Sequence, residues 1–458
     1  MSQQTRRDFL TITLPTAITV ASGLSACGGG SGASASLPPA PPPDPVPPTP
    51  DGYKALVAIY LYGGNDAYNS FVPSDGSAYG SYARARLGLA LPQSQLLDLA
   101  TADNGVRFGA HPALSEIQAL FAQNKAAVLA NVGPLAAPIA DGQVRNPGSL
   151  LPPRLFSHND QSEQWQNTTA ASLESVGWAG RAADLLAQTL PDQRLPIGIT
   201  YNGSNLLQTG RRQIGFALSS SGPVEAAFLR QGPATRSLYA DMLAAPQSHL
   251  FVSEYASGQR RGQDYNARIA DALIGAPASP VVFPNDRLGQ QLAAVARLIS
   301  VRTSLAVKRQ VFFVGLGGFD THSDQLDRHQ ALLRSLSRNL AAFYRATEAL
   351  GVAGSVTSFT ASDFGRSLTV NGDGTDHGWG SHQLIVGGAV RGGRFYGQMP
   401  ELVPGSIRDY GGGRFAPTSS VDQYASTLLQ WFGIPASEMA AVFPNIGRFA
   451  SSNLGFMG

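Results

Sequence analysis

Five short apolar runs, rich in β-branched and aromatic residues, recur along the chain after residue 53. A continuous apolar run, unlike one that alternates with polar residues, is typical of a strand that is buried on both faces. The strands predicted in this way span residues 55–62, 126–132, 196–200, 310–316 and 355–360.

Helical patterns lie between these runs, at residues 112–125, 288–307 and 324–350, where leucines recur near a period of 3.6. Strands that alternate with helices predict an α/β fold with a largely parallel central sheet flanked by helices. We expect one domain over residues 53–458. Its segment 201–276 is more polar, shows no strong helix or strand period, and is predicted to be a cap or insertion.

The N-terminus has the pattern of an export signal. Arg6 and Arg7 precede an apolar stretch, residues 11–24, that is shorter than the roughly 20 residues needed to cross a bilayer. Residues 24–27 resemble the bacterial lipobox and end at Cys27, the only cysteine of the chain. We therefore predict a twin-arginine lipoprotein signal peptide at 1–26, a lipid on Cys27 and a periplasmic, envelope-anchored protein. An ordinary cleaved signal without a lipid is the alternative.

A segment of different composition lies between this signal and the part of the chain that is expected to fold. Residues 27–52 are rich in Gly, Ser and Pro and are predicted to be a disordered linker, since they have too few apolar residues for a core. The formal net charge of the chain is +2, and removing residues 1–26 takes away two Arg and one Asp, which leaves +1. A charge so close to zero predicts no nucleic-acid partner, and contact with a membrane only through the lipid.

Polar clusters follow three of the predicted strands, and each contains an aspartate: Asp66, Asp320 and Asp363. In open α/β sheets the ligand site lies at the carboxyl ends of the strands. A Gly-rich loop at 374–382 adds Asp376 and His377, and His322 follows Asp320 closely. Carboxylates and neutral imidazoles are ligands for zinc or manganese, so these loops are predicted to form a metal site.

These motifs, taken in order, resemble the bacterial family called domain of unknown function 1501, which is grouped with the alkaline phosphatase and sulfatase superfamily. The resemblance covers nearly all of residues 54–458. It is carried by Gly63-Gly64-Asn65-Asp66-Ala67-Tyr68-Asn69, Gly318-Phe319-Asp320-Thr321-His322, Ser362-Asp363-Phe364-Gly365-Arg366, Gly374-Thr375-Asp376-His377-Gly378 and Gly387-Gly388-Ala389-Val390-Arg391-Gly392-Gly393. It implies a three-layer alkaline-phosphatase-like fold and one or two divalent ions.

The resemblance also implies roles for individual residues. The expected metal ligands are Asp66, Asp320, His322, Asp363 and His377, with Asp376 either a further ligand or the group that orients His377. The sequence departs from the superfamily pattern in two ways. One residue instead of three separates Asp320 from His322, and Phe364 stands where a ligand histidine is usual. A second metal is therefore expected to be weakly bound or absent.

The catalytic assignments are candidates. Ser157 precedes a helical pattern and is either the nucleophile or a plain helix cap. His158 is a ligand, a base or a packed side chain, and Arg366 or Arg154 is expected either to clamp an oxyanion or to form a structural ion pair. The resulting hypothesis is a metal-dependent hydrolase of phosphate or sulfate esters, attacked by Ser157 or by water that the metal activates. The alternative is a non-catalytic module that binds a partner protein in the envelope.

Overall fold

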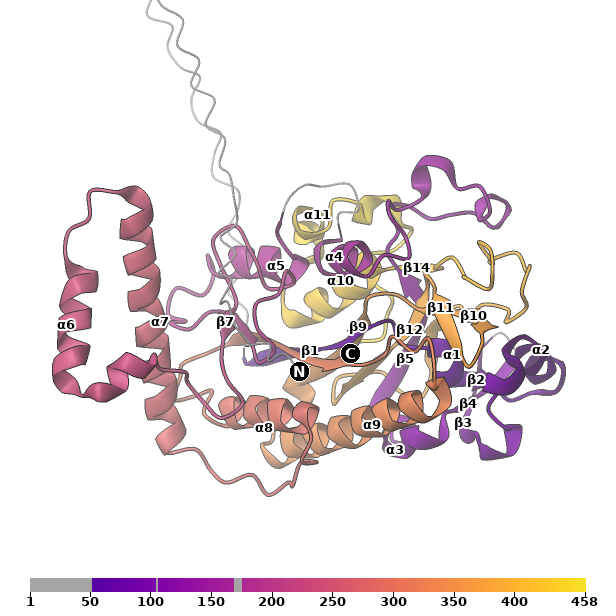
Figure 1. Ribbon diagram of the computed structural model, residues 1–458, viewed down its shortest axis with the longest axis horizontal. Coiled ribbons are helices and arrows are strands. Elements are labelled where there is room, and N and C mark those ends of the chain that lie inside the picture. The colour runs from indigo at the N-terminus through magenta and orange to yellow at the C-terminus, as the bar shows by residue number, and fades with distance from the viewer. Residues whose placement is uncertain (1–51, 104–105, 169–174) are drawn as a thin grey trace, which may run out of the picture. The chain divides into compact units, whose positions relative to one another are not determined.

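The computed structural model describes residues 52–103, 106–168 and 175–458 (Figure 1). The predicted signal peptide, Cys27 and all but the last residue of the predicted linker lie outside the described residues. Within the described part, no helix is long and apolar enough to cross a membrane.

A nine-stranded sheet forms the centre of the molecule, in the order β13-β5-β12-β9-β1-β8-β6-β7, with β14 also paired to β5. All five predicted strands belong to it. Most neighbouring strands are parallel, which confirms the predicted α/β fold, and β12 is the exception because it runs antiparallel to both β5 and β9. The strands are β1 (Lys54–Tyr62), β5 (Ala126–Gly133), β6 (Gly198–Thr200), β7 (Phe216–Ala217), β8 (Arg309–Gly317), β9 (Val356–Ser362), β12 (Ser381–Gly387), β13 (Phe395–Gly397) and β14 (Ser419–Ser420).

Helices cover both faces of this sheet, as Figure 1 shows. One face carries α3 (Ser115–Ala122), α8 (Arg287–Ser300) and α9 (Gln325–Ala349), and the other carries α4 (His158–Asn167), α5 (Trp178–Leu186), α10 (Val421–Phe432) and α11 (Met439–Val442). Alternate side chains of β1 divide between two cores: Val57 and Ile59 pack toward the first set, and Leu56 and Ala58 toward the second. Because both faces are buried, the strands read as continuous apolar runs.

Segment 201–276 is more regular in its second half than the sequence analysis expected. It contains α6 (Pro233–Ala244) and the 25-residue helix α7 (Leu250–Ile274). Figure 1 shows α6 beside the first half of α7, away from the sheet. Apolar side chains such as Leu250 and Phe251 are exposed on these helices, and few of their residues are buried. Because only the end of α7 packs on the core, apolar residues form no continuous stripe along the two helices, and no clear period is visible in the sequence.

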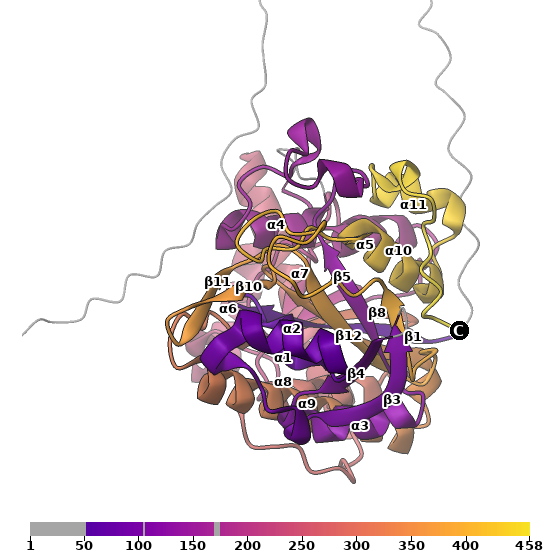
Figure 2. The ribbon, with the colours of Figure 1, turned by 90° about the vertical axis from the view of Figure 1, so that its right-hand side faces the viewer.

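Smaller elements lie beside the main sheet, at the side that faces the viewer in Figure 2. They include a three-stranded sheet of β2 (Phe71–Pro73), β4 (Val106–Ala110) and β3 (Leu97–Asp103), the helices α1 (Ala67–Ser70) and α2 (Gly76–Arg86), and the hairpin of β10 (Arg366–Asn371) and β11 (Gly374–His377). In this hairpin Arg366 pairs with His377. This pairing places Arg366, which follows the loop after β9, directly opposite His377 of the Gly-rich segment.

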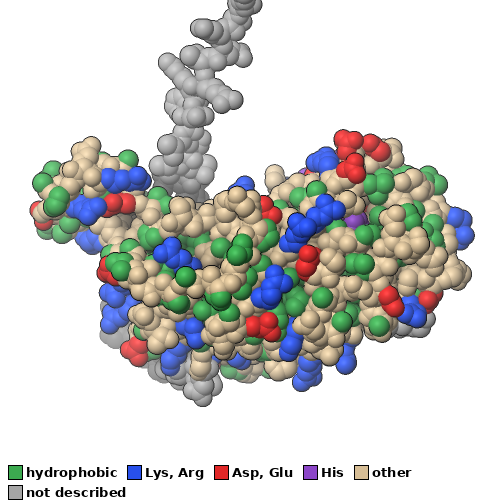
Figure 3. Space-filling model, turned by 90° about the horizontal axis from the view of Figure 1, so that it is seen from below, with side chains coloured by type: hydrophobic (Ala, Val, Ile, Leu, Met, Phe, Trp, Pro, Cys, Tyr) green, Lys and Arg blue, Asp and Glu red, His purple; other side chains and the backbone are tan. Residues whose placement is uncertain are grey.

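The surface that carries α8 and α9 shows Lys and Arg side chains interspersed with Asp and Glu (Figure 3). This face has no large area of one charge. The picture agrees with the near-neutral composition of the chain.

Candidate metal centre

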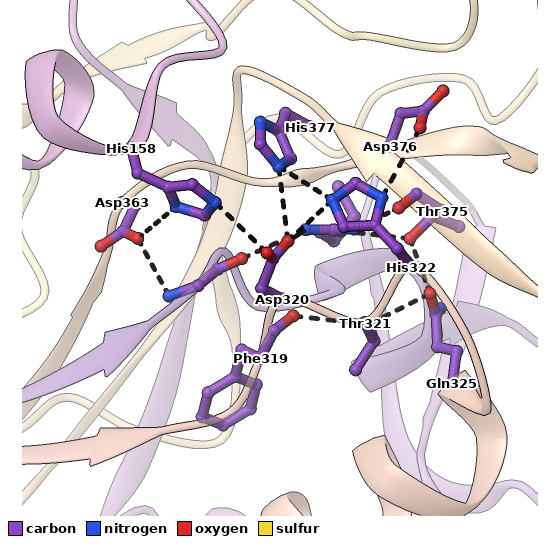
Figure 4. Close-up of polar contacts among 12 residues, drawn as sticks. His158, Phe319, Asp320, Thr321, His322, Gln325, Asp363, Thr375, Asp376 and His377 are labelled. Carbon is purple, nitrogen blue, oxygen red and sulfur yellow. Dashed lines mark hydrogen bonds and ion pairs between the residues drawn. The ribbon is translucent and has the colours of Figure 1, made fainter. Parts of the chain in front are cut away.

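Side chains from three separate segments meet above the carboxyl ends of β8 and β9 (Figure 4). Asp320 and His322 lie in the loop after β8, His377 ends β11, and His158 is the first residue of α4. Within the described residues, His158, Asp320 and His377 each offer one ligand atom, and these atoms lie within 4.8 Å of one another.

Asp320 is the common partner of the three histidines. Its Oδ1 lies 2.9 Å from Nε2 of His322 and 3.3 Å from Nε2 of His377, and its Oδ2 lies 3.5 Å from Nε2 of His158. The Nε2 atoms of His322 and His377 are 3.0 Å apart. Three imidazole nitrogens and one carboxylate thus point at the same small volume.

The other nitrogen of each ring faces a protein acceptor. Nδ1 of His158 is 2.8 Å from Oδ2 of Asp363, and Nδ1 of His377 is 2.7 Å from the carbonyl oxygen of Phe156. Nδ1 of His322 lies 3.7 Å from Oδ1 of Asp376. A carbonyl can only accept, so His377 must carry its proton on Nδ1, which leaves a lone pair on Nε2. Metal-binding histidines are typically held from behind in this way.

The charge states of two of these groups suit a cation. Burial lowers the pKa of His377, which keeps the ring neutral near pH 7. Burial also raises the pKa of Asp320, but the hydrogen bond and charge of Arg366 and the nearby His322 and His158 outweigh it, so the net pKa is lowered. Asp320 is therefore ionised.

Several distances between these atoms are close to those between the ligands of a tetrahedral zinc ion. Donors at about 2.0–2.2 Å from zinc lie about 3.3 Å from one another. The contacts of Asp320 with the three histidines span 2.9 to 3.5 Å, and the ligand atoms of His158, Asp320 and His377 lie within 4.8 Å of one another. The four side chains are between 23% and 45% exposed, so solvent reaches them. The residues present fit a divalent ion.

Arg366 fixes the position of Asp320 from below. Its side chain is fully buried, and Nη1 donates to Oδ1 of Asp320 at 2.6 Å and to the carbonyl oxygen of Gly63 at 3.2 Å. Nε donates to Oγ1 of Thr375 at 3.2 Å, and Nη2 donates to the carbonyl oxygen of the same residue. All three guanidinium nitrogens are thus engaged within the protein, which makes Arg366 a positioning residue for Asp320.

Phe364 closes the centre on the side of the sheet. Its buried ring stacks on His377 at a centroid distance of 4.5 Å and lies 4.7 Å from the ring of His158. Gly64 makes room for it, since a Cβ at that position would lie 2.4 Å from the Phe364 ring. The position at which the sequence analysis expected a histidine ligand thus carries an aromatic ring that packs against two of the histidines.

Asp66 lies outside the histidine group. It is fully buried, and its Oδ1 forms an ion pair of 2.5 Å with the buried Arg86. Its Oδ2 accepts from Nε2 of Gln325 at 2.5 Å. Gln325 in turn accepts from the hydroxyl of Thr375, which Arg366 also contacts. Both oxygens of Asp66 are occupied by protein donors, and this network links the residue to the centre.

A family model described as protein of unknown function (DUF1501) matches residues 53–410. The chain belongs to this family. No curated protein matches the sequence.

Solved structures give distant similarities to this DUF1501 protein. The C-terminal periplasmic domain of EcEptC from Escherichia coli is 9% identical, with a TM-score of 0.34, over 88% of this chain and 91% of that one. The soluble domain of lipooligosaccharide phosphoethanolamine transferase A from Neisseria meningitidis is 7% identical, with a TM-score of 0.33, over 87% and 95%. The PsFucS1 sulfatase from Pseudoalteromonas sp. is 11% identical, with a TM-score of 0.32, over 89% and 70%.

The predicted nucleophile of the DUF1501 protein is engaged as a helix cap. Ser157 is the N-cap of α4, and its hydroxyl donates to Oδ2 of Asp160 at 2.6 Å. This hydrogen bond and the neighbouring Arg154 lower the pKa of Asp160, so Asp160 is a weak base. Arg154 is largely exposed and pairs with Asp160 at 3.1 Å. The structure does not bring Ser157 or Arg154 into the histidine group.

Sequence reasoning missed several supporting groups of the DUF1501 protein. The carbonyl of Phe156 carries no signal in its residue type, because any backbone could supply it. Arg86 ends α2, and Gln325 begins α9 three residues after His322, but nothing in their neighbours marks either side chain as buried. His158 was named as a candidate, and its position directly after a predicted helix cap was the usable signal.

Proposed function

We propose that this protein binds one divalent ion, zinc or manganese, and hydrolyses phosphate or sulfate esters. The observation that carries the proposal is the convergence of three Nε2 atoms on Asp320, each imidazole being backed at Nδ1 by an acceptor. A bound divalent ion would polarise the ester oxygen as a Lewis acid and lower the pKa of water at the site. Its ligands would be His158, Asp320, His322 and His377.

The chain's own residues support this chemistry in distinct ways. Arg366 keeps Asp320 ionised and in place, and its positive charge offsets the carboxylate, so the centre suits an anionic ester. Asp363 orients His158 and favours a proton on its Nδ1. Phe364 excludes water from the side of the sheet. Since the hydroxyl of Ser157 is held by Asp160, we propose that water attacks the ester.

Export completes the proposal. Folding before twin-arginine export would allow the ion to be acquired in the cytoplasm, and a lipid on Cys27 would then hold the protein in the periplasm or envelope. The predicted Gly/Ser/Pro linker would let the folded part reach its ester substrate away from the membrane. We expect no nucleic-acid partner.

The second candidate function is a non-catalytic module that keeps a structural ion and binds an envelope partner. It is favoured by the number of ligands, because four protein ligands are typical of closed structural zinc sites. It is also favoured by Asp66 and Phe364, which leave no ligand set for a second ion among the described residues.

Elemental analysis of the full chain, purified without chelator, tests the metal. We expect about one equivalent of zinc or manganese, lost in Asp320→Asn and His377→Ala and retained in His249→Ala, whose histidine lies at the start of α7. A panel of phosphate and sulfate esters then tests turnover. One bound ion without hydrolysis of any ester would favour the binding module, and a wild-type chain that cannot be loaded would refute both functions.

A further inference from the structure

A second polar cluster lies along the same edge of the sheet as the metal centre. Tyr62 is the last residue of β1 and pairs with Gly317, three positions before Asp320. The next residue, Gly63, donates its N–H to Oδ2 of Asp363 at 2.9 Å. The cluster therefore begins at the residue before Gly63, which holds Asp363, the partner of the proposed ligand His158.

Three side chains form this cluster, which we call the edge triad: Tyr62, Asn202 and Arg287. Nη2 of Arg287 donates to Oδ1 of Asn202 at 2.8 Å, and Nδ2 of Asn202 donates to the hydroxyl of Tyr62 at 3.1 Å. The backbone N–H of Asn202 donates to Oγ1 of Thr200 at 3.1 Å. Asn202 thus orients both of its neighbours.

The edge triad is built onto rigid elements. Gln291, one turn after Arg287 in α8, is buried and binds both the N–H and the C=O of Gly315 in β8 at 3.0 Å each. A Cβ on Gly315 would lie 2.6 Å from Nδ2 of Asn202 and 2.8 Å from the Tyr62 ring. The glycine therefore leaves the space that Asn202 and Tyr62 fill.

The donors of the edge triad are only partly used. Arg287 is exposed, and among the described residues it forms no ion pair with a carboxylate, so most of its N–H groups are available. The hydroxyl of Tyr62 accepts from Asn202, and within the described part no acceptor takes its proton. Burial raises the pKa of Tyr62, so the hydroxyl remains a donor. A guanidinium beside a phenol hydroxyl suits an anionic oxygen.

We propose that the edge triad binds a second anionic group of the ester substrate, a carboxylate, sulfate or phosphate, while the first lies at the metal centre. This inference rests on the proposed function. It defines the substrate class as esters that carry two negative groups, in which Arg287 determines specificity and takes no part in bond cleavage.

Calorimetry with non-hydrolysable ligands tests the proposal on the zinc-loaded full chain. The probes are methylphosphonate, with one anionic group, and a series of bisphosphonates in which one to four methylenes separate two such groups. We expect at least one bisphosphonate to bind about tenfold more tightly than methylphosphonate. Arg287→Ala should remove that advantage without changing the Kd of methylphosphonate, and Arg287→Lys should restore part of it.

Arg297→Ala is the matched control, since Arg297 is exposed on the same helix, donates to the carbonyl of Leu273 and is not part of the edge triad. Equal Kd values for the wild type and Arg287→Ala across the series would overturn the edge triad. An equal loss for methylphosphonate would also overturn it, because the residue would then act at the metal centre. Failure of the proposed function appears separately, as a wild-type chain that takes up no zinc. In a chain without zinc, bisphosphonate binding that depends on Arg287 would still support the edge triad. If such a chain bound no bisphosphonate, the edge triad would be overturned.

Discussion

Replacing Asp363 with asparagine tests whether the histidines are metal ligands. Asparagine has nearly the same shape, and its oxygen can still accept from the N–H of Gly63, so the fold should survive. The change removes the negative charge that lies 2.8 Å from Nδ1 of His158. Without this charge the ring is less firmly oriented and holds a metal ion less tightly. The buried position of Asp363 makes the effect larger, because little water screens it.

Loss of such a supporting carboxylate weakens metal affinity by about 10- to 100-fold. We therefore expect the zinc Kd of Asp363→Asn to rise by that factor, equivalent to about 1.4–2.8 kcal/mol. Competition with a chelating dye at pH 7.5 measures it. Asp376→Asn is the control, since its carboxylate lies 3.7 Å from His322 and is 42% exposed, so we expect a rise of less than about threefold.

A Kd for Asp363→Asn within a factor of two of the wild type, with unchanged urea unfolding, would refute the assignment of His158 as a ligand. Equal losses in Asp363→Asn and Asp376→Asn would show that affinity follows overall charge and not the contact with His158.

Three further changes test other buried parts of the structure. Burial raises the pKa of Asp422 to about 7, whereas an unfolded Asp titrates near 3.9, so the folded state keeps a proton between about pH 4 and 7. The free energy of unfolding should fall as pH rises through that window, by on the order of 3–4 kcal/mol, and urea titrations of Asp422→Asn should lack this fall. Gly63→Ala places a Cβ 2.3 Å from the backbone of the loop after β8, at a φ of +111°. Thermal unfolding should therefore show a loss of about 2 kcal/mol or more in the free energy of unfolding. The control Gly317→Ala, whose Cβ would contact nothing within 4 Å, should lose less than about 0.5 kcal/mol. Arg86→Met should cost about 3–5 kcal/mol in urea unfolding by leaving Asp66 buried and unpaired, and adding Asp66→Asn should recover most of the loss.

Predictions from sequence succeeded where one physical rule acts locally. The apolar runs gave the central strands because burial on both faces leaves no polar alternation, as in β1. The rule that sites lie at the carboxyl ends of strands placed Asp320 and Asp363 at one edge. These inferences needed only the period of the pattern and the direction of the strands.

Side-chain roles within the centre were beyond the same reasoning. Asp363 was expected to be a ligand, yet in the structure it contacts Nδ1 of His158, on the side away from Asp320. Asp376 was expected to be a further ligand or to orient His377, and in the structure its Oδ1 lies 3.7 Å from Nδ1 of His322. A spacing fixes which residues share a loop, but a rotation of one side chain decides whether a carboxylate faces the ion or the histidine behind it.

The four proposed ligands come from three stretches of chain that meet only when the sheet is complete. An unfolded chain holds these residues far apart and has little affinity for the ion. Free zinc at 1,000 times the Kd would therefore stabilise the native state by about 4 kcal/mol through mass action. Metal content would then report how much of a preparation is correctly folded, and a chelator would make the protein easier to unfold even before any catalytic assay is run.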